Sequence, residues 1–369
     1  MKIAADGFEL GRGARGVGRV ILNLLPHLAR LRPGDTIVVY TKEETGQGRL
    51  PGVSEVVLPW SGGYLRWLNG PLRRALRADP PDIFLAANYV LPLFCPVPAV
   101  LFEHDISVVS HPEWYPRKFA LSRKFLVGRS VRRAAAVVVP SEFTRREILS
   151  HFDIPDGKIA TILYGVEDAF HRRPEGQVAR WKEEAGLAGR RLVGFLGSIF
   201  RRRHVPELVR AVGRLRKEMP DLAVHLVGEN LGGLNGSERD ELLALPWVRW
   251  DASLREEDLA LFYSSLDIFA YLSEYEGFGL PPLEALACGT PAVVLDRASL
   301  GEIFRGLAVT VGSADDDAIV RGLRSALAVG SSGGGPAPDP GAVRARFSWA
   351  KAAAELTALL SGLKARGRP

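Results

Sequence analysis

Residues 276–284 read Glu-Gly-Phe-Gly-Leu-Pro-Pro-Leu-Glu, and this stretch indicates both a local fold and a kind of ligand. Pro281 or Pro282 suits the first turn of a helix, where a missing N–H costs nothing. The glycines just before it let the backbone approach a ligand closely. We therefore expect a loop at residues 277–280 whose N–H groups, together with the helix dipole, face an anion such as a phosphate.

The two carboxylates of this stretch should lie on different elements. Glu276 belongs to the loop and Glu284 lies about one turn into the helix, because the prolines start a new helix between them. Two acids beside an anion site predict a ligand that carries hydroxyl groups and phosphates together, such as a nucleotide sugar. The loop by itself is equally typical of an ordinary helix N-terminus.

The flanking sequence adds a buried strand before the loop, at residues 268–272, and an apolar strand after the helix, at residues 292–295. The whole segment resembles the donor-binding segment of the retaining family 4 glycosyltransferases of GT-B fold, which carry Glu, seven residues and Glu around a Gly-Phe-Gly-Leu-Pro core. The resemblance implies that Glu276 holds sugar hydroxyls and that Glu284 accepts hydrogen bonds from ribose. It places the donor nucleotide against Gly277, Phe278, Gly279 and Leu280.

The composition is that of an ordinary soluble globular protein, with 47% hydrophobic and 24% charged residues. A chain of 369 residues exceeds what one core usually serves, so two domains are expected. No apolar run reaches the roughly 18 residues that span a bilayer. The N-terminus lacks the apolar region of a signal peptide, and only Cys95 and Cys288 are present, which fits a reducing cytoplasm.

Short apolar strands alternate with helical stretches, which predicts an α/β fold with parallel sheets in two Rossmann-like halves. The strands expected in the first half lie at residues 3–5, 36–41, 55–58, 83–87, 99–102, 135–139 and 159–163, with helices at 16–31, 64–77, 117–133 and 141–150. In the second half, strands are expected at residues 191–196, 223–227, 248–250, 268–272, 292–295 and 308–311, with helices from 205 and at 237–244, 256–264 and 315–328. A polar linker near 168–175 and a flexible loop at 330–341 complete the pattern.

The resemblance implies the GT-B arrangement, in which two parallel sheets face each other across a cleft. An N-terminal domain, residues 1–170, would bind the acceptor. A C-terminal domain, residues 171–345, would bind the nucleotide sugar. A last helix within 346–369 would cross back to the N-terminal domain.

Residues 11–16 match the pattern G-x-G-x-x-G, but the first strand should end by about Asp6, too far upstream for a dinucleotide-binding turn. The residues Gly16-Val17-Gly18-Arg19 instead resemble the glycine-rich loop of the family's first strand. The amides of Gly16 and Gly18 would then face the sugar diphosphate. A merely flexible turn is the alternative.

His104 and Asp105 follow the strand at 99–102, and residues at the carboxyl ends of parallel strands face the ligand crevice. A lone histidine is more often a satisfied surface or core group. The run at 104–107, followed by His-Pro-Glu-Trp at 111–114, resembles the histidine loop of family 4 mannosyltransferases. This implies that His104 contacts the transferring sugar, while Asp105 orients the loop.

Ser198 follows the strand at 191–196, and Arg202 and Arg203 occupy the positions of the family's Arg-Lys pair. Two fixed cations would stabilise the charge that a departing diphosphate gains in the transition state, without a metal. The chain departs from the family at Phe200, where an acid is usual, and at His204, where Asn is usual. A solvated basic turn is the alternative reading.

The base of the donor is expected near Gly228 and Leu254, although no hydrogen-bond code for guanine or uracil can be read there. We find no His/Asp cluster with metal spacing, no Asp-x-Asp and no Gly-x-Ser-x-Gly in the sequence. No metal and no cofactor are therefore expected, and the donor substrate is a nucleotide-diphosphate sugar.

The net charge of +6 comes entirely from the first half, since residues 1–165 hold 22 Lys/Arg and 15 Asp/Glu. The excess is densest at residues 60–77 and 115–133, where basic residues alternate with aromatic and aliphatic ones. Such runs suit an anionic membrane surface, and also nucleic acid. We favour a membrane surface over nucleic acid; a solvated helix face is the plain alternative.

The resemblance implies a retaining, metal-independent hexosyltransferase that moves mannose, from GDP-mannose by preference, to a glycan or lipid-linked acceptor. Front-face displacement fits better than double displacement, because no residue is placed as a nucleophile. Three rivals remain: a glycoside hydrolase using the Glu pair, a GT-B epimerase acting on a nucleotide sugar, and a non-enzymatic module that binds anionic membrane or nucleic acid.

Overall fold

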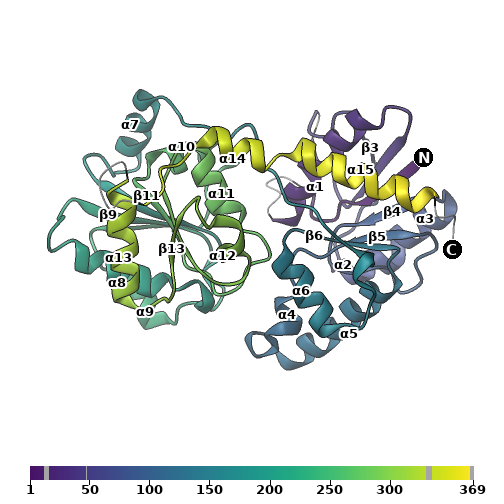
Figure 1. Ribbon diagram of the computed structural model, residues 1–369, viewed down its shortest axis with the longest axis horizontal. Coiled ribbons are helices and arrows are strands. Elements are labelled where there is room, and N and C mark those ends of the chain that lie inside the picture. The colour runs from purple at the N-terminus through teal and green to yellow at the C-terminus, as the bar shows by residue number, and fades with distance from the viewer. Residues whose placement is uncertain (12–15, 47, 330–334, 366–369) are drawn as a thin grey trace. The chain divides into compact units, whose positions relative to one another are not determined.

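Two parallel β-sheets organise the part of the chain that the computed structural model describes, which is residues 1–11, 16–46, 48–329 and 335–365 (Figure 1). Contacts divide the chain into two units. Unit 1 is Met1–Gly165 with the C-terminal segment from Phe347, and unit 2 is Val166–Arg346. The α/β architecture with two parallel sheets expected from the sequence is confirmed.

The sheet of unit 1 has the strand order β3-β2-β1-β4-β5-β6-β7, and every neighbouring pair is parallel. Ile3 in the middle of the sheet pairs with Ile37 on one side and Ile83 on the other. The strands are β1 (Lys2–Asp6), β2 (Thr36–Thr41), β3 (Ser54–Val57), β4 (Ile83–Ala86), β5 (Ala99–Phe102), β6 (Ala136–Val139) and β7 (Ile159–Thr161).

The helices of unit 1 are α1 (Val17–Leu31), α2 (Tyr64–Trp67), α3 (Arg73–Ala78), α4 (Ser107–Ser110), α5 (Arg117–Arg133), α6 (Glu142–His151) and α15 (Trp349–Ala365). The single helix expected at 64–77 is interrupted by a π-helical segment, Leu68–Leu72. Pro71 lies inside that segment and removes a backbone donor, which accounts for the irregular turn.

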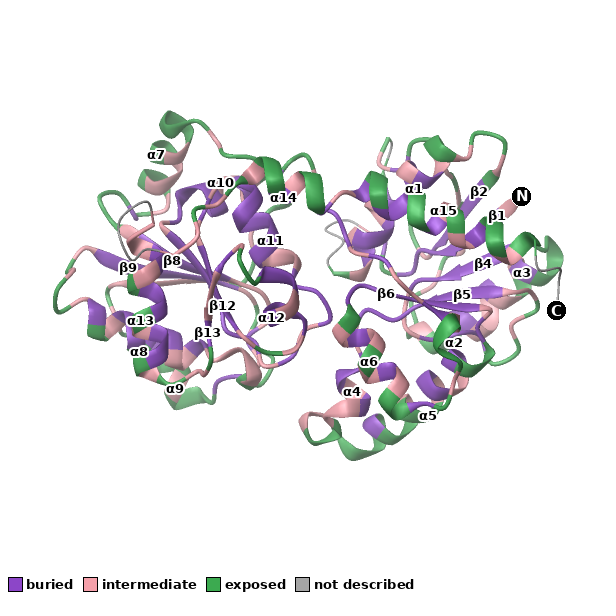
Figure 2. Cartoon of the chain, in the orientation of Figure 1, coloured by how far each residue is buried: buried purple, intermediate pink, exposed green. Residues whose placement is uncertain are grey.

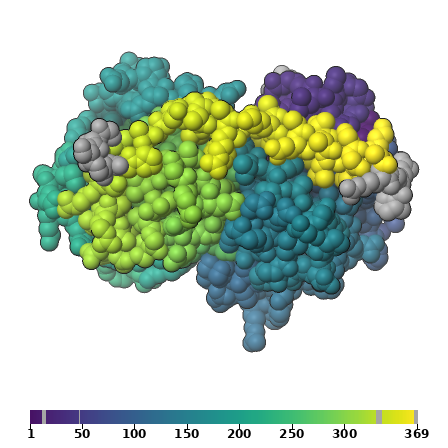
Figure 3. Space-filling model, in the orientation of Figure 1, coloured from purple at the N-terminus to yellow at the C-terminus, as the bar shows by residue number. Residues whose placement is uncertain are grey.

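The last helix, α15, packs on α1. The guanidinium of Arg32, just after α1, donates to the carbonyl of Thr357 at 3.5 Å and to the hydroxyl of Ser361 at 3.2 Å. Figure 3 shows the yellow C-terminal segment beside the purple N-terminal one. Residues about 325 positions apart in the chain therefore share one unit.

The sheet of unit 2 has the order β10-β9-β8-β11-β12-β13, again parallel throughout. Its strands are β8 (Arg191–Leu196), β9 (Leu222–Val227), β10 (Val248–Asp251), β11 (Ile268–Tyr271), β12 (Ala292–Leu295) and β13 (Val309–Val311). Its helices are α7 (Glu175–Glu184), α8 (Val205–Leu215), α9 (Gly236–Leu243), α10 (Leu259–Ser265), α11 (Leu280–Ala287), α12 (Ala298–Phe304), α13 (Asp316–Leu327) and α14 (Pro340–Arg346).

The inner strands of both sheets are buried beneath the helices, as Figure 2 shows in purple. Every residue of β4, β5, β6, β11 and β12 is buried. A parallel sheet covered on both faces needs apolar side chains on both sides of each strand, which is why these strands read as continuous apolar runs.

Each sheet has one point at which the strand order reverses. In unit 1 this switch point lies between β1 and β4, and in unit 2 it lies between β8 and β11. Ligands of open α/β sheets bind in the crevice at the carboxyl ends of the strands flanking such a point. The residues that follow β1, β4, β8 and β11 are therefore the first place to look for a site.

The prediction of a loop over residues 330–341 is wrong at its C-terminal end, because α14 begins at Pro340. The amide of Ala342 donates to the carboxylate of Asp339 at 3.0 Å, so an acid caps this helix where the sequence had suggested a loop. Residues 330–334 lie outside the described residues. No helix in the described parts of the chain is long and apolar enough to cross a membrane.

Candidate functional site

At the switch point of unit 2, a short basic segment after β8 meets the loop after β11. We call the 3₁₀ turn Arg201–Arg203 the cationic turn, and residues 272–279 the Glu276 loop. Nε and Nη2 of Arg203 both donate to one carboxylate oxygen of Glu276, at 3.0 and 2.8 Å. The hydroxyl of Tyr271 donates to the same oxygen at 3.0 Å. The structure thus brings together two residues that the sequence had placed in one site.

The main chain ties the two segments as well. The amide of Glu274 donates to the carbonyl of Arg202 at 2.9 Å. Nη1 of Arg203 donates to the carbonyl of Ser198 at 2.8 Å. The guanidinium of Arg202 lies 4.3 Å from the ring centroid of Phe200, so an aromatic face takes the place that an acid usually has in the family.

Two glycines let the loops after β8 and β9 pack backbone against backbone. Gly197 has φ 142° and Gly228 has φ 148°, values that side chains rarely permit. A Cβ on Gly228 would lie 2.0 Å from the carbonyl oxygen of Gly197. Gly228 and Ser198 are therefore held close together at the carboxyl ends of adjacent strands.

The predicted start of a helix after the glycine loop is confirmed, since α11 begins at Leu280 with a proline in its first turn. Gly279 caps the helix with φ 110°, and a Cβ there would meet Leu300 at 2.7 Å and Phe304 at 2.9 Å. Phe278 is only 4% exposed. Its side chain belongs to the core, so a ligand can meet this position only through the backbone.

Glu284 has different surroundings from Glu276. It is 2% exposed and accepts a hydrogen bond from the hydroxyl of Tyr263 at 2.7 Å. The two acids lie on loop and helix as expected, but this burial leaves Glu284 almost no surface for a ligand. Its contact with ribose stays a prediction.

Leu254 lies after β10, the edge strand of the sheet, and is half-buried. Ser198 and Gly228 follow β8 and β9, the next two strands inward. The three positions expected near the nucleotide therefore follow the carboxyl ends of three neighbouring strands.

At the switch point of unit 1 lies a shallow depression of the surface. Asp6, Glu9, Gly18 and Asn88 contribute its polar and glycine lining, with Gly7, Leu10, Val17 and Ile21 completing it. The carboxylate of Asp6 accepts from the hydroxyl of Tyr64 at 2.6 Å and from the amide of Phe8 at 3.0 Å. Burial nevertheless raises the pKa of Asp6 to about 6.

Sequence reasoning missed Asp6, Glu9 and Asn88, although Asp6 ends a strand, which is the signal used for His104. Gly16 caps α1 with φ 51° and Gly18 lines the depression. Two carboxylates beside Gly18 disfavour an anion and suit hydroxyl groups, so diphosphate contact by these glycines stays a prediction. Residues 12–15 of the G-x-G-x-x-G match lie outside the described residues.

His104 is held at both ring nitrogens inside unit 1. Nε2 lies 2.7 Å from the carbonyl of Ala87 and Nδ1 lies 2.5 Å from the hydroxyl of Tyr164. A carbonyl only accepts, which assigns the proton to Nε2 and makes Nδ1 the acceptor of the Tyr164 hydroxyl. Burial lowers the pKa of His104, consistent with a neutral ring. Contact with a sugar through Nε2 would require exchange of the Ala87 partner.

Asp105 stabilises the loop that follows, since it accepts from the amide of Ser107 at 2.8 Å and from its hydroxyl at 2.6 Å. The preceding Glu103 is fully buried, and neither of its carboxylate oxygens has a hydrogen-bond partner among the described residues. Burial raises the pKa of Glu103 well above its usual value, which favours the neutral form of this carboxyl group.

Within the residues that the structure describes, no group of three or more His, Cys, Asp or Glu side chains is arranged to hold a metal ion. The charged groups of unit 2 at the switch point include the guanidinium groups of Arg202 and Arg203 and the carboxylate of Glu276. They offer hydrogen-bond donors for phosphate oxygens and acceptors for hydroxyls.

Known proteins resemble both units. Residues 178–331 match the family profile "Glycosyl transferases group 1", and residues 14–170 match "Glycosyltransferase Family 4". The O-antigen chain mannosyltransferase B of Escherichia coli is 29% identical over 252 residues, which is 66% of this chain and 65% of that protein. The GDP-mannose-dependent alpha-(1-6)-phosphatidylinositol monomannoside mannosyltransferase of Mycolicibacterium smegmatis is 30% identical over 62% of this chain and 63% of its own length. Both alignments span just under two thirds of the relative.

Solved structures share the fold. Anabaena HepE in complex with UDP-glucose has a TM-score of 0.76 at 16% identity, covering 98% of this chain and all of that one. Sucrose-phosphate synthase from Thermosynechococcus elongatus also has a TM-score of 0.76, at 18% identity and 99% coverage of this chain. The two adjoining family matches, the related mannosyltransferases and the common architecture show that the chain belongs to glycosyltransferase family 4, with the GT-B fold.

Proposed function

We propose that this protein is a retaining, metal-independent glycosyltransferase. It moves a hexose, mannose by preference, from a nucleotide-diphosphate sugar to a glycan or lipid-linked glycan acceptor. The observation that carries the proposal is the pairing of Arg203 with Glu276 at the switch point of unit 2. The mannosyltransferase relatives, one of them named as GDP-mannose-dependent, support mannose and GDP-mannose as the donor.

The chemistry assigned to the site follows from its charges. Arg202 and Arg203 bind the diphosphate and stabilise the negative charge that it gains as the bond to the sugar breaks. Glu276 orients Arg203 at rest and accepts hydrogen bonds from sugar hydroxyls when the donor is bound. The acceptor oxygen bonds to the anomeric carbon on the face that the phosphate leaves, and the departing phosphate oxygen takes the acceptor's proton. His104 contacts the transferring sugar.

The depression in unit 1 suits the hydroxyl groups of an acceptor. Glu9 and Asn88 lie at its surface and are linked by a hydrogen bond of 3.3 Å, so they present both an acceptor and a donor. Asp6 at its base adds a carboxyl group that is half protonated near pH 6. Such a mixture recognises sugar hydroxyls, which both donate and accept.

Calorimetric titration with GDP, UDP and ADP tests the donor site. The double variant Arg202→Ala, Arg203→Ala should bind nucleoside diphosphate more than tenfold more weakly, about 1.4 kcal/mol or more. Arg201→Ala is the matched control, because Arg201 belongs to the same turn but pairs with Glu238 at 2.7 Å and is 63% exposed. Transfer measured with EDTA present should equal transfer without it.

Unchanged affinity in a folded double variant would refute the assignment of the diphosphate site. Product analysis separates the remaining reactions: free sugar released to water marks a hydrolase, and an altered nucleotide sugar with no transfer marks an epimerase. Activity that EDTA abolishes would contradict metal independence.

We further propose that the protein works on the cytoplasmic face of an anionic membrane, where a lipid-linked acceptor resides. Support comes from α5. Its N-terminal half exposes Phe119, Leu121 and Phe125, at 43%, 64% and 67%, beside basic side chains. In the run at residues 60–77, by contrast, Trp67 and Leu68 are fully buried. The second basic run is therefore the stronger candidate for a membrane contact.

A further inference from the structure

His204 lies at the junction of the cationic turn and α8, in a left-handed backbone conformation with φ 50°. Its Nε2 lies 2.8 Å from a carboxylate oxygen of Glu274, in the Glu276 loop. Its Nδ1 lies 3.7 Å from a carboxylate oxygen of Glu207, in the first turn of α8. One imidazole thus bridges two segments that converge on the proposed diphosphate site.

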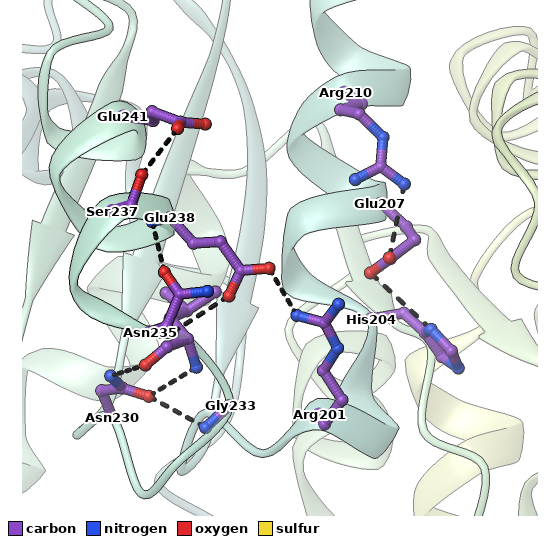
Figure 4. A network of polar contacts seen from close by, with 11 residues as sticks. Arg201, His204, Glu207, Arg210, Asn230, Gly233, Asn235, Ser237, Glu238 and Glu241 are labelled. Atoms are coloured by element: carbon purple, nitrogen blue, oxygen red, sulfur yellow. Dashed lines mark hydrogen bonds and ion pairs between the residues drawn. The ribbon is translucent and has the colours of Figure 1, made fainter.

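The charged groups around His204 come from three elements. Glu207 on α8 also accepts from Arg210 at 3.3 Å, and these residues appear together in Figure 4. Glu274 comes from the Glu276 loop. In the cationic turn, Arg201 points toward Glu238 at the start of α9, and Arg203 holds Glu276. The two carboxylates therefore face His204 directly, while Arg201 and Arg203 each have another carboxylate partner and the guanidinium of Arg202 lies over the ring of Phe200.

The arrangement favours a charged imidazole. The nearby carboxylate of Glu207 raises the pKa of His204, and the hydrogen bond with Glu274 adds to this against the effect of burial. Burial opposes ionisation of Glu207, but its pairing with His204, the backbone and Arg210 lowers the pKa of Glu207 to about 2. A neutral imidazole carries one N–H and an imidazolium carries two. Only the protonated ring can serve both carboxylates at once.

We propose that protonated His204 is a positioning residue that clasps the Glu276 loop to α8 and the cationic turn, so that nucleoside diphosphates bind most tightly while His204 is charged. The clasp acts two residues before Glu276 and next to Arg203, through the same segments that the amide of Glu274 joins to the carbonyl of Arg202. This inference rests on the proposed diphosphate site.

The direction of the pH dependence follows from linkage. The pKa of His204 in the folded protein is raised above its ordinary value of about 6.5, so the ring is charged below that pH, and its contribution to ligand binding is lost as the pH rises through the raised value. A bound diphosphate brings further negative charge to the site and should draw a proton onto the ring. The buried His225 pairs with Asp251, and burial lowers the pKa of His225, so its titration lies below this window.

Calorimetry with GDP and UDP, at about pH 6 and about pH 8.5 in buffers of different ionisation heat, measures both affinity and proton uptake. His204→Asn removes the charge while keeping a residue type that tolerates left-handed backbone. Glu274→Gln removes one carboxylate partner of His204. The side chain of Glu274 is 39% exposed, so the protein should tolerate this change. His171→Asn is the matched control, an exposed histidine of unit 2 that binds the carbonyl of Asp168 at 3.0 Å.

Between the two pH values, wild type and the control should lose about threefold or more in affinity relative to His204→Asn, and should take up protons on binding. In His204→Asn the affinity should lack this pH-dependent loss, and binding should take up no proton at this site. In Glu274→Gln the dependence of affinity on pH should be weaker than in wild type. Comparison within one ligand cancels the ionisation of the phosphate itself.

A folded His204→Asn protein with the wild-type pH profile and proton uptake would overturn the clasp and leave the diphosphate site intact. If His204→Asn does not fold, an unaltered profile in Glu274→Gln overturns it. Failure of every nucleoside diphosphate to bind wild type would refute the proposed function, and the clasp with it. This outcome differs from the two above, in which wild type still binds the nucleotide.

Discussion

At the scale of single residues, Glu276 and Glu284 differ in what they touch. Glu276 faces Arg203 and Tyr271, whereas Glu284 is buried against Tyr263. We expect Glu276→Gln to lower kcat by about tenfold or more, because it removes a charge that orients both donor sugar and guanidinium. Glu284→Gln should mainly raise the KM for the donor. Steady-state kinetics at varied donor concentration measure both effects.

Tyr263→Phe is the control for Glu284, since it removes that bond without touching the carboxylate. If Tyr263→Phe raises the donor KM as much as Glu284→Gln does, the acid acts through packing and its ribose role is wrong. Near wild-type kinetics in Glu276→Gln would remove this residue from the reaction.

Asp6 gives a second residue-scale prediction, for stability. Its pKa is raised from 3.8 to about 6 by burial, so the folded state binds the proton more tightly than the unfolded state. The contribution of Asp6 to the free energy of unfolding therefore falls as the pH rises from about 4 through 6. Asp6→Asn never ionises, so its unfolding free energy should rise by roughly 2.4 kcal/mol relative to wild type between pH 4 and 7.

Urea unfolding of both proteins at the two pH values measures that difference, and other titrating groups cancel in the comparison. The exposed Asp153→Asn serves as control. A difference between wild type and Asp6→Asn that stays constant with pH would show that Asp6 ionises as freely as an exposed acid.

The site could be predicted from the sequence only where neighbouring residues share a motif. Arg203 and Glu276 were each recognisable within their own segments, and the fold then joined them. Tyr64 and Asp6 lie 58 positions apart, and no local pattern connects a tyrosine of α2 with the end of β1. The side chain of Phe278 belongs to the core, so the expected contact of this residue with the donor involves its backbone and stays a prediction.

At the scale of elements, several boundaries could be predicted from the sequence alone. The expected limits of β2, β5, β8, β12 and α5 agree with the structure residue for residue. Helix α7 was missed because none of its residues is buried, so it has no apolar stripe to reveal a helical period. Helix α12 was also not predicted: five of its seven residues are buried, so little polar face marks the period.

The order of the strands was beyond the sequence, and it decides where the site lies. Alternating strands and helices predict parallel sheets but not which strands are neighbours. Only the structure shows that β8 lies next to β11, although 71 residues separate the end of one from the start of the other. That neighbourhood places the cationic turn beside the Glu276 loop.

At the scale of the whole molecule, charge is distributed unevenly. Residues 1–165 carry +7, from 22 basic and 15 acidic residues, and the remainder carries −1, from 26 and 27. The three most exposed large apolar side chains, Phe94, Leu121 and Phe125, belong to unit 1, as does Phe119, whereas unit 2 exposes Leu231 and Leu243. Arg73 and Arg123 lie over the rings of Phe94 and Phe119, so cations and aromatic rings meet at this surface.

This pairing of charge with exposed apolar groups predicts binding to anionic vesicles at low salt. Each basic side chain near such a surface contributes about 1 kcal/mol, and salt screens the attraction. Changing Arg117, Lys118, Arg123 and Lys124 to Gln should weaken binding at least about tenfold in a flotation assay.

The matched control changes four exposed basic residues of unit 2 to Gln, namely Arg172, Arg180, Arg190 and Lys217. Both variants carry +2 in place of +6, so equal losses would indicate a response to net charge alone. Wild-type protein that ignores anionic vesicles even at low salt would point to a solvated basic face and a soluble acceptor.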